Sequence, residues 1–190
     1  PGEPDTANTN FLLAEIFFES EDFGLATAEY ERTAYGYPFH DKSAEAGYAA
    51  ILAYREHEET LEGAARAEWH QAYLDSGLRF ADTYPEHPES GEELTTVAED
   101  LFAQNQFDLA LAVAQTVVAK QPPVSPDLAR TAWTVLAHSH FDLRNYAEAE
   151  AAYYQLRPLT PASDAEAVAD VNDRIASSIY KQGELARDGG

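Results

Sequence analysis

The stretch Trp133–Tyr153 reads WTVLAHSHFDLRNYAEAEAAY and decides the fold of this chain. A small residue, Ala137, stands one turn before His140, and a second small residue, Ala149, follows twelve positions after the first. An aromatic residue, Tyr146, lies just ahead of the second alanine. Because small and large residues recur here at helical spacing, the stretch predicts two helices that pack against each other antiparallel.

The same arrangement occurs in three more segments. Residues 11–30 read FLLAEIFFESEDFGLATAEY, residues 97–110 read VAEDLFAQNQFDLA, and residues 175–184 read IASSIYKQGE. Helices approach closely only where small side chains face each other, so the repetition predicts a stack of helical hairpins. The matching small residues, aromatics and closing prolines are Ala14, Ala26, Phe23 and Pro38, then Ala98, Ala110, Phe107 and Pro122, and then Ala176.

This pattern resembles the tetratricopeptide repeat, which spans about 34 residues. The resemblance covers nearly the whole chain and implies an all-α fold, a right-handed α-solenoid of antiparallel helix pairs that binds protein. The closest matches to the signature are Trp133, Leu136, Ala137, Tyr146, Ala149, Tyr153 and Pro161. The departures are Asn10 and Asn172 in place of an aromatic, His140 in place of a tyrosine, and Thr33 and Val117 in place of a small residue.

We expect a single repeat domain over residues 1–190, with units at about 7–40, 41–88, 91–124 and 125–162 and a first helix at 163–188. The second unit is irregular, with helices expected at Ser43–Glu56 and Leu61–Thr83 and a buried face formed by Tyr48, Ala49 and Leu52.

Two helix starts are readable from the sequence. Ser125 precedes Pro126, which suits an N-cap followed by a proline at the first helical position. The segment Ser163-Asp-Ala-Glu166 predicts a capping box.

The chain carries 34 acidic and 12 basic residues, a formal net charge of -22. Such a surface repels phosphate backbones and anionic lipid, and it attracts a basic partner. The acidity is equally compatible with a salt-adapted source, in which case it says little about the partner. No apolar run is long enough to cross a membrane, so we expect no membrane insertion.

Two short segments carry a further resemblance. Tyr84-Pro-Glu-His-Pro88 resembles repeat boundaries in bacterial cell-envelope tetratricopeptide proteins, among them outer-membrane lipoproteins, and Ile175–Glu184 resembles an internal repeat of large proteobacterial members. This implies a periplasmic or outer-membrane-associated protein, with a cytoplasmic one as the alternative. Because position 1 is not methionine, we expect a fragment whose repeats continue past Gly190.

In this family the first helices line an inner groove that holds a peptide or partner protein. Mapped by the alignment, the groove is aromatic along its floor and acidic at intervals, which suits a partner bearing Lys or Arg. The alternative is that these aromatics only fill space between helices. The candidate groove residues are Phe11, Glu15, Phe18, Tyr54, Glu99, Phe102, Thr134, His138, Phe141 and Tyr180.

No pattern in the sequence predicts an enzyme, a cofactor or a metal site. His138 and His140 lie two apart on a helix and point in different directions, and cysteine is absent. The basic clamp by which chaperone-binding members hold a carboxylate is missing, since Phe11, Glu15, Thr95, Glu99 and Thr131 stand at its positions. A second hypothesis is self-association through open repeat ends, since Ile175 and Ile179 lack a second helix to cover them.

Overall fold

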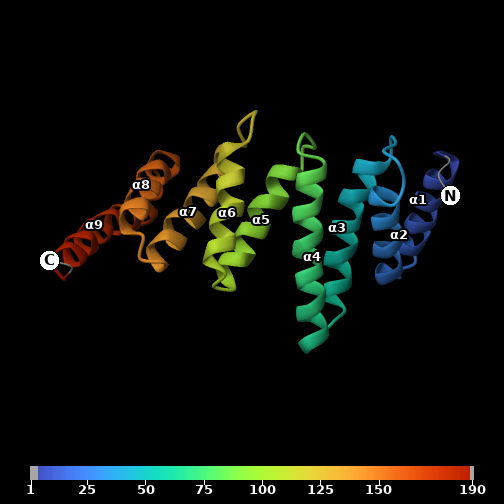
Figure 1. Cartoon of the computed structure of the whole chain (residues 1–190), viewed down its shortest axis with the longest axis horizontal. Coiled ribbons are helices and arrows are strands. Elements are labelled where there is room, and N and C mark those ends of the chain that lie inside the picture. The colour runs from blue at the N-terminus through green and yellow to red at the C-terminus, as the bar shows by residue number, and fades with distance from the viewer. Residues whose placement is uncertain (1–3, 189–190) are drawn as a thin grey trace. The chain divides into compact units, whose positions relative to one another are not determined.

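The computed structural model describes residues 4–188, and within that range the chain is all-helical, with no strand. Throughout this range, every helix is too short or too polar to traverse a bilayer. The helices are α1 Pro4–Glu19, α2 Phe23–Tyr35, α3 Ser43–Glu59, α4 Gly63–Thr83, α5 Ser90–Ala103, α6 Phe107–Ala119, α7 Pro126–Asp142, α8 Tyr146–Leu156, a short 3-10 turn Arg157–Leu159, and α9 Ala165–Asp188 (Figure 1).

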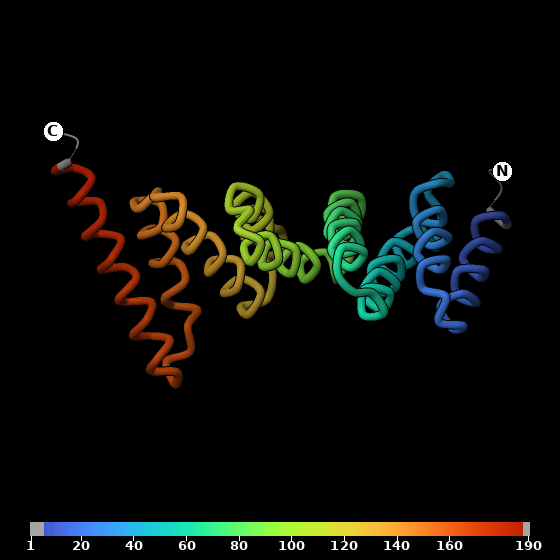
Figure 2. The backbone as a smooth tube through the Cα atoms, turned by 90° about the horizontal axis from the view of Figure 1, so that it is seen from below, coloured from blue at the N-terminus to red at the C-terminus, as the bar shows by residue number. Residues whose placement is uncertain are grey.

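The chain forms two compact units, the first ending at Ser90 and the second beginning at Gly91. In the first unit, α1 packs on α2, α2 on α3 and α3 on α4. In the second unit, α6 packs on α7, α7 on α8 and α8 on α9, and Figure 2 shows α9 as the long last helix beside α8. Within each unit, these helices pack on their neighbours in sequence, as the predicted stack of hairpins requires.

Three of the hairpins are closed by the same backbone turn. Glu21, Asn105 and Arg144 each follow the first helix of a hairpin, and each adopts a left-handed conformation with φ of 61°, 60° and 64°. A left-handed residue reverses the chain within a few positions, so that the second helix returns along the first. None of these residues is a glycine, which is the usual choice at such a position.

Two backbone hydrogen bonds fix each of these turns. In the first, the amide of Glu21 donates to the carbonyl of Phe18 at 3.0 Å, and the amide of Asp22 donates to the carbonyl of Phe17 at 2.9 Å. This is the Schellman arrangement, which satisfies carbonyls at the end of a helix. The same two bonds recur from Asn105 to Phe102 and Gln106 to Leu101, and from Arg144 to Phe141 and Asn145 to His140.

Of the seven small residues predicted from the repeat, Ala176 on α9 is exposed and the other six are buried, as predicted. Their side chains have no exposed surface, because a backbone approaches from the facing helix and leaves room only for a methyl group. These six residues, each with 0% exposure, are Ala14, Ala26, Ala98, Ala110, Ala137 and Ala149.

Two departures from the repeat pattern compensate for each other in the first hairpin. Asn10 stands where an aromatic is usual and Thr33 where a smaller residue is usual. The Asn10 side-chain amide donates to the Thr33 hydroxyl at 3.0 Å and to the carbonyl of Glu29 at 2.8 Å. Thr33 is fully buried, so these bonds satisfy polar groups that would otherwise be costly.

The irregular second hairpin differs from the prediction at its turn. Helix α3 extends to Glu59 and α4 begins at Gly63, which takes the left-handed φ of 59°. The predicted buried face of α3 was also wrong, since its three expected residues are only half-buried. Helices α2 and α4 both pack on α3, and its buried residues are instead Ser43, Ala46, Gly47, Ala50, Ile51 and Ala53.

The two predicted helix starts had different outcomes. The Ser125 hydroxyl accepts from the amide of Leu128 at 3.3 Å with Pro126 at the first helical position, which confirms that N-cap. The capping box at Ser163 was wrong, because α9 begins at Ala165 and Asp164 caps it, its carboxylate accepting from the amide of Ala167 at 3.0 Å. A carboxylate also complements the positive end of the helix dipole.

Replacing Ala149 with leucine should destabilise the chain by about 1–3 kcal/mol, because the larger side chain cannot fit between α7 and α8. Urea denaturation followed by circular dichroism measures the change. Ala151→Leu, at an exposed position of the same helix, is the control and should change stability by less than about 0.5 kcal/mol. Equal effects of the two substitutions would contradict the close approach of the helices.

Replacing Arg144 or Glu21 with glycine should stabilise the chain by about 1 kcal/mol, because glycine adopts the left-handed conformation without strain. Asn105→Gly should increase the stability of the chain by less, since asparagine tolerates the left-handed conformation better than arginine or glutamate. Thermal denaturation of the three variants tests this order. Ala151→Gly, in a regular helix, should instead cost about 1 kcal/mol, and a loss of stability in all four would refute the turn assignment.

Candidate functional site

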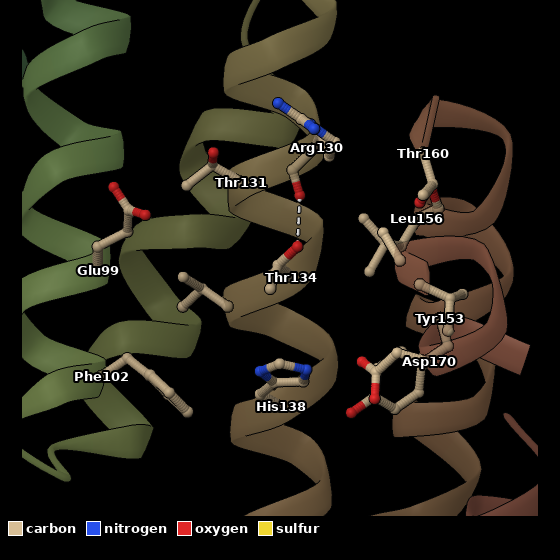
Figure 3. A pocket seen from close by; sticks show the side chains of 13 residues that line it. Glu99, Phe102, Arg130, Thr131, Thr134, His138, Tyr153, Leu156, Thr160 and Asp170 are labelled. Carbon is tan, nitrogen blue, oxygen red and sulfur yellow. Dashed lines mark hydrogen bonds between the residues drawn. The ribbon is translucent and has the colours of Figure 1, made fainter. Parts of the chain in front are cut away.

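The second unit contains a cleft of about 420 Å³ between the first helices of three successive hairpins. Ligand pockets commonly have volumes of this order. Glu99 and Phe102 come from α5, His138 from α7, Tyr153 from α8 and Asp170 from α9. Figure 3 shows the α5 residues on one wall, His138 in the middle and Tyr153 with Asp170 on the other wall. We call this the α5–α7–α9 cleft.

An aromatic strip crosses the cleft. The ring of His138 lies 5.9 Å from the ring of Phe102 on one side and 5.7 Å from the ring of Tyr153 on the other. Phe102 also packs on Phe107 at 5.5 Å, which anchors it to the next helix. Phe102 and His138, whose rings are tilted by 45° to each other, give the cleft a weakly polar aromatic surface of the kind that planar and cationic groups favour.

Carboxylates stand on both walls. Glu99 is exposed and has no ion-pair partner among residues 4–188. Partial burial and the charge of Asp100 raise the pKa of Glu99 above its ordinary value. On the opposite wall, Asp170 lies 3.6 Å from Arg174, which is too long for a well-formed hydrogen bond.

One further cation lies at the cleft. Arg130 on α7 pairs with Asp127 at 3.3 Å, one turn earlier in the same helix. Its backbone carbonyl accepts from the hydroxyl of Thr134 at 2.9 Å, as Figure 3 shows. Asp127 balances the charge of Arg130, and Arg174 lies close to Asp170. The carboxylate of Glu99, unpaired in the described part of the chain, therefore leaves the cleft with a net negative charge.

His138 and Tyr153 are both held in their neutral forms. Burial lowers the pKa of His138, and the nearby charge of Arg174 lowers it further, while Asp170 and Asp142 act in the opposite direction. Burial raises the pKa of Tyr153. At neutral pH the aromatic strip therefore carries no charge, and the charged residues of the cleft are Glu99, Arg130 and Asp170.

The Tyr153 hydroxyl is buried without a hydrogen-bond partner among the described residues, and the side chain is 0% exposed. A buried polar group in this state costs about 1–3 kcal/mol relative to a satisfied one. Such groups are uncommon in folded proteins, so each one calls for a physical explanation.

Four of the ten predicted groove residues line this cleft: Glu99, Phe102, Thr134 and His138. Three others lie together in the first unit around Tyr30. Phe11 is buried there with its ring 5.8 Å from that of Tyr30, Phe18 packs on the same ring at 6.4 Å, and Glu15 accepts a hydrogen bond from the Tyr30 hydroxyl.

The remaining three predicted residues lie outside the cleft. Tyr54 packs on Trp69 with ring centres 5.3 Å apart, and burial raises its pKa to about 12. Phe141 packs on Tyr146 at 5.2 Å, as Phe102 packs on Phe107. Tyr180 on α9 is 63% exposed.

Side-chain size explains why the fourth hairpin is open where the first is filled. Phe11 and Glu15 in the first hairpin match Thr134 and His138 in the fourth, counted from Ala14 and Ala137. The large ring of Phe11 packs into the core of its hairpin, whereas the short side chain of Thr134 fills less space at the same position. The opening therefore follows from a single size difference in the repeat.

Sequence reasoning missed Arg130, Tyr153 and Asp170 as cleft residues. Tyr153 matches a position of the repeat that packs inside the hairpin, and the alignment gave no sign that its hydroxyl would lack a partner. Asp170 lies on the first half of α9 and was not among the predicted groove residues. The relative placement of α7, α8 and α9 brings these residues together.

The cleft has no feature of a metal site. Within residues 4–188, no three His, Asp or Glu side chains come together in a way that could hold a metal ion. His138 lines the cleft, whereas the Nδ1 atom of His140 is buried elsewhere in the same helix without a hydrogen-bond partner in the described part of the chain. The side chains that line the cleft offer charged groups, aromatic rings and hydroxyls.

Comparison with known proteins identifies no relative: no family model matches the chain, and no curated protein matches it. The functional argument therefore rests on the geometry of the cleft and on the repeat pattern.

Proposed function

We propose that this chain is a protein-interaction scaffold of the tetratricopeptide type, a right-handed α-solenoid segment that holds a peptide or partner protein in the α5–α7–α9 cleft. The observation that carries the proposal is the cleft itself, which is lined by the first helices of successive hairpins and has an aromatic floor. Repeat proteins use such surfaces for binding, and aromatic rings supply large contact area at small entropic cost.

The proposed partner is a protein with a basic surface, and no cofactor or catalysis is involved. The formal net charge of -22 disfavours nucleic acid and anionic lipid as ligands. A periplasmic or outer-membrane-associated bacterial location is proposed from the resemblance of its repeat boundaries, with a cytoplasmic one as the alternative.

Selection of displayed random peptides against the whole chain tests the proposal. Phe102→Ala should lower the affinity of the chain for the selected peptides by about tenfold, because the Phe102 ring forms one end of the aromatic strip. The matched control is Phe141→Ala, which removes an equivalent ring pair outside the cleft and should leave binding unchanged. Similar melting curves for the two variants would exclude a folding defect, and equal loss of binding in both would contradict the cleft as the site.

A second candidate function, self-association through open repeat ends, has its own supporting observation. On α1, Leu12 is 62% exposed and Ile16 is 59% exposed, and on α9, Ile179 is 48% exposed and Leu185 is 51% exposed. Large apolar side chains on the first and last helices are typical of surfaces that another helix covers.

If the ends associate, the mass measured by small-angle scattering should rise with protein concentration at high salt, where the acidic surface is screened. Leu12→Asp with Ile16→Asp should keep the chain monomeric. Leu109→Asp, at a 54% exposed position on α6, is the control and should not change the mass. A monomer at every concentration would rule out this function.

A further inference from the structure

The internal repeat supplies a direct comparison for the buried Tyr153 hydroxyl. Tyr30 and Tyr153 occupy the same position, four residues after the second small residue of their hairpins, Ala26 and Ala149. The Tyr30 hydroxyl donates a hydrogen bond to Glu15. The residue that matches Glu15 in the fourth hairpin is His138, and the Tyr153 hydroxyl finds no partner there within residues 4–188.

The unsatisfied hydroxyl lies at the α5–α7–α9 cleft. Tyr153 lines it, and its ring is 5.7 Å from that of His138. Figure 3 shows the Tyr153 side chain on the wall that faces His138, in the same region as Asp170. A ligand group that hydrogen-bonds to this hydroxyl would remove the cost of its burial, which the first hairpin avoids with its own carboxylate.

The charges around the hydroxyl decide which group can do so. Arg174 is the strongest of the charges that act on Tyr153, followed by the carboxylates of Asp170 and Asp142. Glu99 and Arg130 also line the cleft, so the three carboxylates outnumber the two cations. The net negative charge of these groups repels a ligand carboxylate or phosphate and attracts a cationic donor.

We propose that the α5–α7–α9 cleft binds an arginine side chain of the partner protein, with the guanidinium stacked on the Phe102–His138 strip and donating to the Tyr153 hydroxyl and the carboxylates of Glu99 and Asp170. A planar guanidinium presents five donors and stacks on aromatic faces, so it suits an aromatic strip between two carboxylates better than a lysine ammonium does. This inference rests on the proposed function, because it specifies the chemistry of the same site.

The test uses N-acetyl-arginine methylamide as the probe and N-acetyl-citrulline methylamide as its uncharged counterpart, each titrated into the whole chain and followed by NMR. The arginine probe should give saturable shifts of the Phe102, His138 and Tyr153 ring signals, and the citrulline probe should bind at least tenfold more weakly. Equal shifts with the two probes, or shifts confined to other residues, would overturn the proposal.

Three variants assign the contacts. Glu99→Gln and Asp170→Asn should each weaken the arginine probe several-fold, while Glu92→Gln and Asp173→Asn, exposed carboxylates on the same two helices that do not line the cleft, should not. Tyr153→Phe should also weaken the probe, yet its melting temperature should be unchanged or raised, because the substitution removes only the unpartnered hydroxyl. A lowered melting temperature would show that the hydroxyl has a partner within the chain, which would refute its role in binding.

The outcomes for the two proposals are distinguishable. A chain that binds displayed peptides without preferring arginine keeps the proposed function and loses the arginine site. A chain that binds neither the displayed peptides nor the arginine probe loses both.

Discussion

The hairpins of this chain depend on a left-handed residue in each tight turn and on alanines that let the paired helices touch. The turn brings the second helix back along the first, and the two backbone hydrogen bonds of the turn fix where that return begins. Only then do the small residues of the two helices face each other, with 0% exposure. Because the same turn occurs after α1, α5 and α7, equivalent residues of these hairpins occupy comparable positions.

Because the hairpins are equivalent, the residues at the cleft can be compared with the residues at the same positions in the first hairpin. Where the first hairpin places a large ring and a carboxylate that accepts from its tyrosine, the fourth places Thr134 and a neutral His138. The backbone geometry is conserved between the two turns, so the difference lies in side-chain size and hydrogen-bonding capacity. In the first hairpin, the Tyr30 hydroxyl is hydrogen-bonded to Glu15, so this polar group is satisfied within the hairpin. The other leaves a cleft and a buried hydroxyl with no partner in the described residues.

The accuracy of the sequence predictions followed the range of the interactions that decide each feature. The alanine positions and the Ser125 N-cap depend on local spacing, and the N-cap and six of the seven alanine positions were confirmed, whereas Ala176 is exposed. The start of α9 was misplaced by choosing Ser163 rather than the adjacent Asp164, since either residue type can cap a helix. The buried face of α3 was also misjudged, because it depends on how α2 and α4 pack on that helix from two sides.

The sequence by itself determined the helical hairpins, their boundaries to within a few residues, and four of the side chains that line the cleft. These follow from periodicity along a single chain, since spacing sets which residues share a helix face. The tertiary structure decided which candidates meet. It brought Glu99 and His138 together with Tyr153 and Asp170, which the sequence did not predict as cleft residues. It also buried Phe11 in the core of the first unit. The physical reason is that a ring can either fill a gap in the core or line a cleft. Which of the two occurs depends on the sizes of side chains from other helices, and the residue spacing along one helix carries no information about those sizes.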